Sequence, residues 1–308
     1  MLKINDSEFN RLVTFMRERY GINLSHKRTL IEGRLSNMLY ERGFKNYDDY
    51  LDCCLNDKSG KELDGLLIKL TTNHTYFMRE PEHFKYLTDT VLPFLKQVNA
   101  KTKTMRIWSA GCSSGEEAYT TAMHISEFLG KEKTAWDTRI LATDISLRTL
   151  AGAQNGVYLA SGLSDLPDGW IDKYFDRLDS EKCKIKPELR REVIFRTFNL
   201  MEPIPYKKAP FDLIFCRNVM IYFEMETKLA LVNRFFDVLR PGGYLFIGHA
   251  ESIPRDTTQY QYIKPAIYRK PLQSTTLAFL SSHSRLSPSA RIKPSFISMS
   301  FLPSKPFT

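Results

Sequence analysis

The sequence predicts an α/β fold with an open, mostly parallel, Rossmann-like sheet, preceded by a small N-terminal all-helical domain. From Met105 onward, short apolar strands alternate with helical patterns, as in a parallel sheet that carries helices on both faces. Residues 1–72 instead show only the apolar periodicity of helices. A length of 308 residues fits two domains. We therefore expect a helical domain of residues 1–72 and an α/β domain of residues 73–270.

Composition limits the class of protein. The chain is 43% hydrophobic, which is enough for a sizeable core. It has no run of 18 apolar residues and no apolar signal region at its start, so we expect no membrane insertion. The five cysteines are odd in number and form no C-x-x-C pair, which disfavours disulfides and a zinc site. We expect a cytoplasmic protein without a metal.

The net charge of +9 favours an acidic partner. Part of this charge lies in residues 271–308, which are rich in Ser and Pro and contain basic residues but no acids. We interpret this segment as a disordered basic tail.

Four helices are expected in the first domain. Asp6 or Ser7 is a candidate cap for the first helix, and Gly21 can end it. Ser25 is the candidate cap of the second helix and Asn46 that of the third. The fourth helix has a leucine face formed by Leu63, Leu66, Leu67 and Leu70.

Basic residues outnumber acidic ones between positions 9 and 45. The basic residues are Arg11, Arg17, Arg19, Lys27, Arg28, Arg34, Arg42 and Lys45, against Glu18, Glu32 and Glu41. A solvated helix face explains such a run, and so does a docking surface for an acidic partner. Because the charges are not interleaved with a stripe of aromatics, nucleic acid is not the expected partner.

A polar connector follows, T-T-N-H-T-Y-F-M-R-E, from Thr71 to Glu80. It breaks the helical period, and Pro81 then begins a new helix. His74 has no metal-like companions in the sequence, so we expect a structural histidine.

The stretch M-R-I-W-S-A-G-C-S-S-G-E-E is the first strand-to-helix turn of the sheet. A strand over Met105–Trp108 leads into a loop of small residues, Ser109–Gly115, whose glycines allow backbone to approach a ligand closely. It is neither G-x-G-x-x-G nor a P-loop. Glu116 and Glu117 at the helix start oppose a phosphate and favour a cation, as in an adenosyl sulfonium with an α-ammonium group. An ordinary turn with acids in the first helical turn remains the alternative.

Later strands carry further candidate residues at their ends. Asp144 ends the strand of R-I-L-A-T-D-I-S, where an acid can accept hydrogen bonds from both ribose hydroxyls of a nucleoside. Alternatively, Asp144 caps the next helix. A strand V-I-F-R-T-F-N-L ends in Asn199 and Leu200, and the buried strand Ala209–Arg217 runs into Asn218.

The remaining elements complete the expected sheet. Residues 156 to about 192 interrupt the alternation and are too long for a simple connection, so we interpret them as an insertion. After a helix closed by L-R-P-G-G, we expect a strand in Y-L-F-I-G-H-A-E-S and a last strand or hairpin over Tyr260–Lys270.

Four segments together resemble the CheR-type chemotaxis receptor methyltransferases over about residues 5–270. They are T-T-N-H-T-Y-F-M-R-E, W-S-A-G-C-S-S-G-E-E-A-Y, A-T-D-I-S, and F-D-L-I-F-C-R-N-V-M-I-Y-F with L-R-P-G-G-Y-L-F-I-G-H-A-E-S. C-R-N-V-M-I-Y-F is the most specific, because it is long and the fold does not dictate it. The resemblance implies a class I methyltransferase domain with an inserted β-subdomain.

The resemblance also implies a cofactor and its site. S-adenosylmethionine would be converted to S-adenosylhomocysteine, and Arg79 and Tyr222 would be the catalytic residues nearest the methyl group. One or both of Glu116 and Glu117 would bind the ammonium, Asp144 the ribose, and Asn199 with Leu200 would flank the adenine. The full implied cofactor set is Asn73, Thr75, Arg79, Glu116, Glu117, Asp144, Asn199, Leu200, Arg217 and Asn218.

The implied reaction forms methyl esters on glutamates in the cytoplasmic helical region of methyl-accepting chemotaxis receptors, with the enzyme as a monomer. A glutamate with a pKa of about 4.3 is already ionised at neutral pH, so no general base is required. Arg79 and Tyr222 would then orient the carboxylate. Two alternatives stay open: a methyltransferase of the same fold that acts on another protein, a small molecule or nucleic acid, and a non-enzymatic protein that senses the cofactor.

Overall fold

The computed structural model describes residues 2–71, 73–205 and 209–272, and the chain begins with the expected four helices. They are α1 (Asp6–Tyr20), α2 (Arg28–Glu41), α3 (Tyr47–Asn56) and α4 (Lys61–Leu70). Their apolar faces form one core that includes Met16, Ile31 and Leu66. The predicted tail lies outside the described residues, apart from Pro271 and Leu272.

The ends of these helices correct part of the sequence interpretation. Asn5, not Asp6 or Ser7, caps α1, because its side chain and that of Glu8 bond to each other's backbone N–H groups in a capping box. The predicted end of α1 at Gly21 and the predicted start of α3 at Asn46 are confirmed. Ser25 does not cap α2, which begins at Arg28 without a side-chain cap.

Half of the eight basic residues between positions 9 and 45 form bonds inside the helical domain. Arg11 forms ion pairs with Asp48 and Asp52, and Arg28 forms one with Asp6. Arg42 binds both carboxylate oxygens of Glu62, and Arg34 donates to the backbone oxygens of Lys69 and Thr71. These side chains therefore hold helices together, whereas Arg17 and Lys27 are exposed.

The α/β prediction is confirmed by a seven-stranded sheet in the order β6-β2-β1-β7-β8-β10-β9. The strands are β1 (Ile107–Ala110), β2 (Ile140–Asp144), β6 (Val193–Thr197), β7 (Phe211–Cys216), β8 (Leu239–Ile247), β9 (Gln261–Lys264) and β10 (Ile267–Arg269). The pairs from β6 through β8 are parallel, and the last hairpin, β9 with β10, is antiparallel to β8.

Several strand boundaries differ from the prediction. β6 ends at Thr197, before Asn199 and Leu200, and β7 spans Phe211–Cys216 and not Ala209–Arg217. β1 begins at Ile107, two residues later than expected, and extends to Ala110. β8 begins at Leu239, so L-R-P-G-G belongs to the strand. A register shift between Phe211 and Leu213 of β7 absorbs the extra residues.

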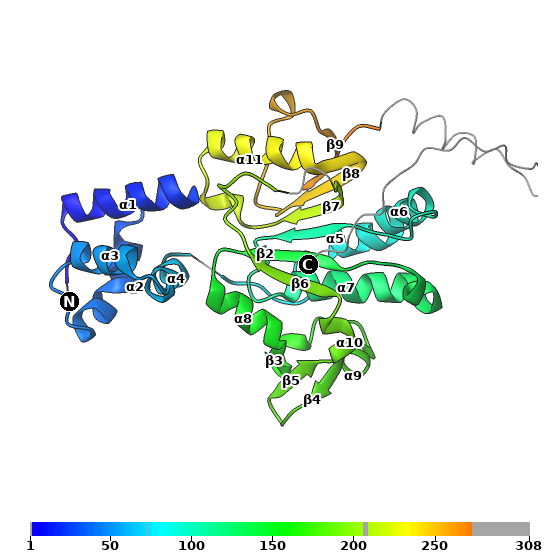
Figure 1. Cartoon of the computed structure of the whole chain (residues 1–308), viewed down its shortest axis with the longest axis horizontal. Helices are drawn as coiled ribbons and strands as arrows, with labels where there is room; N and C mark the ends of the chain where they lie inside the picture. Colours follow the sequence, from blue (N-terminus) through cyan, green and yellow to red (C-terminus); the bar gives the residue numbers. More distant parts are fainter. Residues whose placement is uncertain (1, 72, 206–208, 273–308) are drawn as a thin grey trace, which may run out of the picture. The chain divides into compact units, whose positions relative to one another are not determined.

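Helices cover the sheet, as Figure 1 shows. They are α5 (Pro81–Tyr86), a π-helical turn η1 (Leu87–Val91), α6 (Leu92–Val98), α7 (Glu116–Leu129), α8 (Leu147–Asn155) and α11 (Met225–Val238). Because side chains alternate along strands, Ile107 and Phe215 enter the core with α5–α8, whereas Trp108 and Ile214 enter the core with α11. Short 3-10 helices are η2 (Gly130–Ala135), η3 (Ala160–Leu163), η4 (Met220–Tyr222) and η5 (Arg255–Thr257).

The inserted β-subdomain is a separate three-stranded antiparallel sheet in the order β3-β5-β4. Its strands are β3 (Val157–Leu159), β4 (Phe175–Arg177) and β5 (Lys182–Ile185), with short helices α9 (Trp170–Tyr174) and α10 (Pro187–Arg190). Figure 1 shows it grouped below the large sheet. No helix of the described residues is long and apolar enough to cross a membrane.

Candidate functional site

A cavity lies at the carboxyl ends of β1, β2 and β7, where the chain order in the sheet changes direction. Ligands of open α/β sheets bind at this kind of position. The cavity encloses about 1060 Å³ of empty space, including its open mouth.

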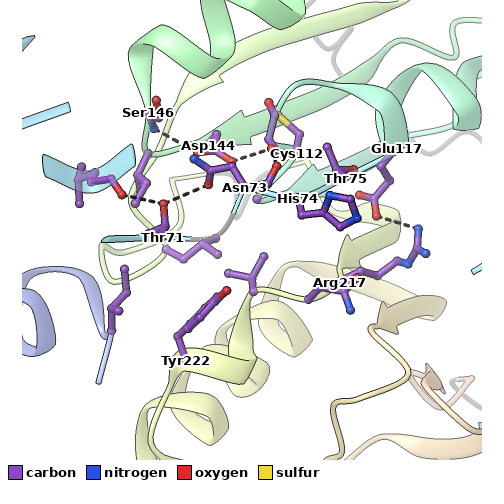
Figure 2. A pocket seen from close by; sticks show the side chains of 18 of the residues that line it. Thr71, Asn73, His74, Thr75, Cys112, Glu117, Asp144, Ser146, Arg217 and Tyr222 are labelled. Atoms are coloured by element: carbon purple, nitrogen blue, oxygen red, sulfur yellow. Dashed lines mark hydrogen bonds and ion pairs between the residues drawn. The ribbon is translucent and has the colours of Figure 1, made fainter. Parts of the chain in front are cut away.

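Asp144 forms one end of the cavity (Figure 2). Its Oδ2 accepts a 2.8 Å hydrogen bond from the Ser113 backbone N–H, and its Oδ1 accepts a 3.1 Å bond from that of Ser146. Ser146, not Asp144, caps α8, because its hydroxyl accepts from Thr149 N–H. Burial raises the pKa of Asp144, although the backbone N–H groups oppose that rise. Each oxygen keeps a lone pair for a ribose hydroxyl.

Glu117 and Arg217 form the other end of the cavity (Figure 2). Arg217 Nη1 lies 3.1 Å from Glu117 Oε2, and the hydroxyl of Ser109 donates to Glu117 Oε1 at 2.6 Å. Burial raises the pKa of Glu117, against the attraction of Arg217. Glu116 does not line the cavity, since its carboxylate accepts from the Ser114 hydroxyl. Of the two acids at the start of α7, the structure therefore places only Glu117 at the cavity.

The connector forms one wall of the cavity through Asn73, His74, Thr75 and Arg79. The Asn73 backbone oxygen accepts from the Ser113 hydroxyl at 3.1 Å, which ties the connector to the first loop. Arg79 Nη1 donates to the His74 backbone oxygen at 2.6 Å, so only part of the guanidinium is used internally. The remaining N–H groups of Arg79 can hold an anion.

Tyr222, in η4, also lines the cavity, and Figure 2 shows it facing Asn73 and Asp144 across the opening. The helical domain holds the Tyr222 backbone, because the Asn23 backbone N–H donates to the Tyr222 backbone oxygen at 2.9 Å. Asn218 lines the cavity with φ of +60°, a left-handed conformation that turns the chain sharply after Arg217.

Asn199 and Leu200 line the cavity two and three residues after the end of β6, and Phe198 between them and the strand donates its N–H to the Asp144 backbone oxygen. The Asn199 amide donates to the Arg19 backbone oxygen at 2.8 Å and its Oδ1 accepts from Met201 N–H, so protein groups fix its orientation. Leu200 is buried and presents an apolar surface suited to a flat base.

The structure thus brings all the sequence-predicted site residues except Glu116 to one cavity. Sequence reasoning missed Tyr20, Ile22 and Leu67 of the helical domain, which also line it. In the sequence, these three residues have the pattern of ordinary core positions of a helical domain, so no local signal marked them as part of a binding site. Their presence shows that the helical domain and the α/β domain together build the cavity.

The donor set is suited to a positively charged nucleoside and an anionic second molecule. The acids Asp144 and Glu117 lie at opposite ends of the cavity, and Arg79 and Tyr222 supply hydrogen-bond donors. Within the part of the chain that the structure describes, His74 is the one histidine that lines the cavity. The cavity therefore offers groups that bind and orient a reacting anion.

Comparison with known proteins gives consistent matches. The chain matches the all-alpha domain of CheR methyltransferases over residues 7–71 and their SAM binding domain over residues 73–268. A chemotaxis protein methyltransferase of Borreliella burgdorferi is 43% identical over 273 residues, which are 87% of this chain and 96% of that protein. One from Escherichia coli is 34% identical over 255 residues, 82% of this chain and 86% of that protein.

Proposed function

Because the chain belongs to the CheR methyltransferase family, with its all-alpha domain and its SAM binding domain, we propose that it methylates chemotaxis receptors. It transfers the methyl group of S-adenosylmethionine to receptor glutamates, and forms methyl esters and S-adenosylhomocysteine. The observation that carries this proposal is the single cavity in which Asp144 and Glu117 lie at opposite ends, with Arg79 and Tyr222 also on its wall.

The cavity fits the cofactor by chemistry. Asp144 can accept from the two ribose hydroxyls, and Leu200 and Asn199 can flank the adenine. Glu117 can bind the α-ammonium, while Asn73, Thr75 and Asn218 line the cavity between these groups. When bound, S-adenosylmethionine supplies a methyl group on a positively charged sulfur.

The protein's own residues place the nucleophile. A receptor glutamate enters as a carboxylate, so no proton has to be removed before attack. Arg79 holds this carboxylate by a charge-assisted bond, and the Tyr222 hydroxyl donates a further bond that aligns it. Because opposite charges cancel in the transition state, exclusion of water by the apolar wall favours the reaction.

The partner is the helical cytoplasmic region of the receptors, and we place the enzyme in the cytoplasm as a monomer. Arg17 and Lys27 are exposed and provide positive charge on the helical domain. In sequence they flank Asn23, whose backbone N–H donates to the Tyr222 backbone oxygen. These charges would attract an acidic receptor helix.

Transfer of a radiolabelled methyl group tests the proposal. We expect label from S-adenosylmethionine in purified receptor, and its release as volatile methanol in mild base, which is typical of an ester. Label in nucleic acid, in a small molecule or in a base-stable bond would favour another methyltransferase. Cofactor binding without transfer would favour a sensor protein.

A further inference from the structure

Glu80 lies directly after Arg79 but does not line the cavity. It precedes α5 with φ of +57°, and its side chain makes no capping bond to that helix. The carboxylate turns instead toward β7, and its side chain is only 13% exposed. A buried acid that leaves its own helix uncapped must be stabilised by other partners.

Two of those partners, Arg217 and Asn218, line the cavity. Glu80 Oε2 accepts from Nε and Nη2 of Arg217 at 3.2 and 3.1 Å, and Oε1 accepts from the Asn218 amide at 3.3 Å and from His249 N–H at 3.1 Å. Arg217 also donates to the backbone oxygen of Arg79. Burial alone would raise the pKa of Glu80, but Arg217 and these hydrogen bonds outweigh it and lower the pKa.

The charge balance of this cluster decides what it can bind. Arg217 is almost completely buried, with 2% of its side chain exposed, and it lies 3.1 Å from a carboxylate oxygen of both Glu80 and Glu117. Without Glu80, the guanidinium would cancel the charge of Glu117 and leave the pair neutral. With Glu80, the three side chains carry a net charge of −1, so a further cation is attracted.

We propose that Glu80 is a positioning residue that neutralises Arg217, so that Glu117 stays available for the α-ammonium group of the cofactor. This inference rests on the proposed function, because it assumes a cofactor with an amino-acid end. Glu80 also accepts from the Asn218 amide, and it holds the Arg217 guanidinium that donates to the backbone oxygen of Arg79.

A metal site does not explain the same cluster. Ligand atoms of Glu80, His83 and His249 lie within 4.8 Å of one another. However, both oxygens of Glu80 already accept hydrogen bonds, and the Arg217 cation touches one of them. A second cation at this carboxylate would be repelled by Arg217.

Calorimetry with two ligands tests the proposal. S-adenosylhomocysteine has the α-ammonium group, whereas 5′-methylthioadenosine shares the nucleoside but lacks the amino-acid end. We expect Glu80→Gln to weaken the binding of S-adenosylhomocysteine about fivefold or more, because the charge of Arg217 then cancels the charge of Glu117. Binding of 5′-methylthioadenosine should stay within about twofold. Glu82→Gln, which removes a charge from the exposed surface two residues away, should leave both affinities unchanged.

Two further results separate charge from structure. Glu80→Asp keeps the negative charge, so we expect it to bind S-adenosylhomocysteine more tightly than Glu80→Gln does. The inference is overturned if Glu80→Gln lowers the affinity for both ligands equally, or if it lowers the affinity for neither. Receptor methylation by the wild-type enzyme is measured separately: if it fails while the ligand-selective loss is seen, the receptor substrate is wrong and the role of Glu80 stands.

Discussion

Replacement of Asp144 by Asn tests how the cavity binds a nucleoside. The carboxylate of Asp144 provides about four acceptor positions. The N–H groups of Ser113 and Ser146 occupy two of them, at 2.8 and 3.1 Å, which leaves about two for the ribose hydroxyls. An amide keeps one oxygen and replaces the other with a donor, so at least one charge-assisted ribose bond is lost.

A charge-assisted hydrogen bond contributes about 1.5–3 kcal/mol, which corresponds to roughly a 10- to 150-fold loss of affinity. We expect Asp144→Asn to fall in this range for S-adenosylhomocysteine, and Asp144→Ala to lose at least tenfold. Calorimetry is the assay. Asp137→Asn is the control, because the exposed Asp137 pairs with Arg139 just before β2. The affinity of this variant for S-adenosylhomocysteine should stay within about twofold of wild type.

Stability should respond differently from binding. Burial raises the pKa of Asp144, so its contribution to folding is present below the ordinary carboxyl pKa and is lost as pH rises through the raised pKa. At pH 8 the ionised form therefore costs stability in the unliganded protein. Asp144→Asn removes this cost, but its amide nitrogen cannot accept from one of the two backbone N–H groups of Ser113 and Ser146. The unliganded unfolding midpoint should therefore fall less, relative to wild type, at pH 8 than at low pH. Unchanged affinity for S-adenosylhomocysteine in a folded Asp144→Asn protein would remove Asp144 from the site.

Three further predictions concern catalysis and docking. Tyr222→Phe should lower turnover with little change in cofactor affinity, and Arg79→Ala should lower turnover more, as steady-state kinetics with calorimetry will show. Turnover should be nearly flat from about pH 6 to 8.5, because the substrate carboxylate is already ionised; a steep rise through pH 7 that vanishes in His74→Ala would mean that a general base exists. Reversal of Arg17 and Lys27 to Glu should raise the KM for receptor a few-fold at low salt and less at high salt, and normal methylation at low salt would place docking elsewhere.

Local sequence patterns predicted much of the fold and of the cavity wall. The alternation of strands and helices predicted that β1 and β2 run parallel, as they do. Parallel strands bring their carboxyl ends to one edge of the sheet. Asp144 and Glu117, each next to a strand end or a first turn, therefore reach the same cavity. Glu116 does not, because one residue turns a helical side chain by about 100°.

Contacts between distant segments were beyond sequence reasoning. Glu80 and Arg217 are 137 residues apart, and their pairing depends on how α5 packs against β7. Arg28 and Arg34 counted as surface charge in the sequence. In the structure, Arg28 pairs with Asp6 and Arg34 bonds to the end of α4, so charge reversal there would test folding and not docking.

Mass spectrometry of methylated receptor tests the central claim most directly. The wild-type enzyme, S-adenosylmethionine and the helical cytoplasmic fragment of a chemotaxis receptor are incubated, and the modified residues are located by tandem fragmentation. The account predicts one added methyl group per event on glutamate side chains, removed by mild base and strongly reduced with Tyr222→Phe. Methyl groups on lysine, arginine or cysteine, or an unmodified receptor with a cofactor-bound enzyme, would contradict it.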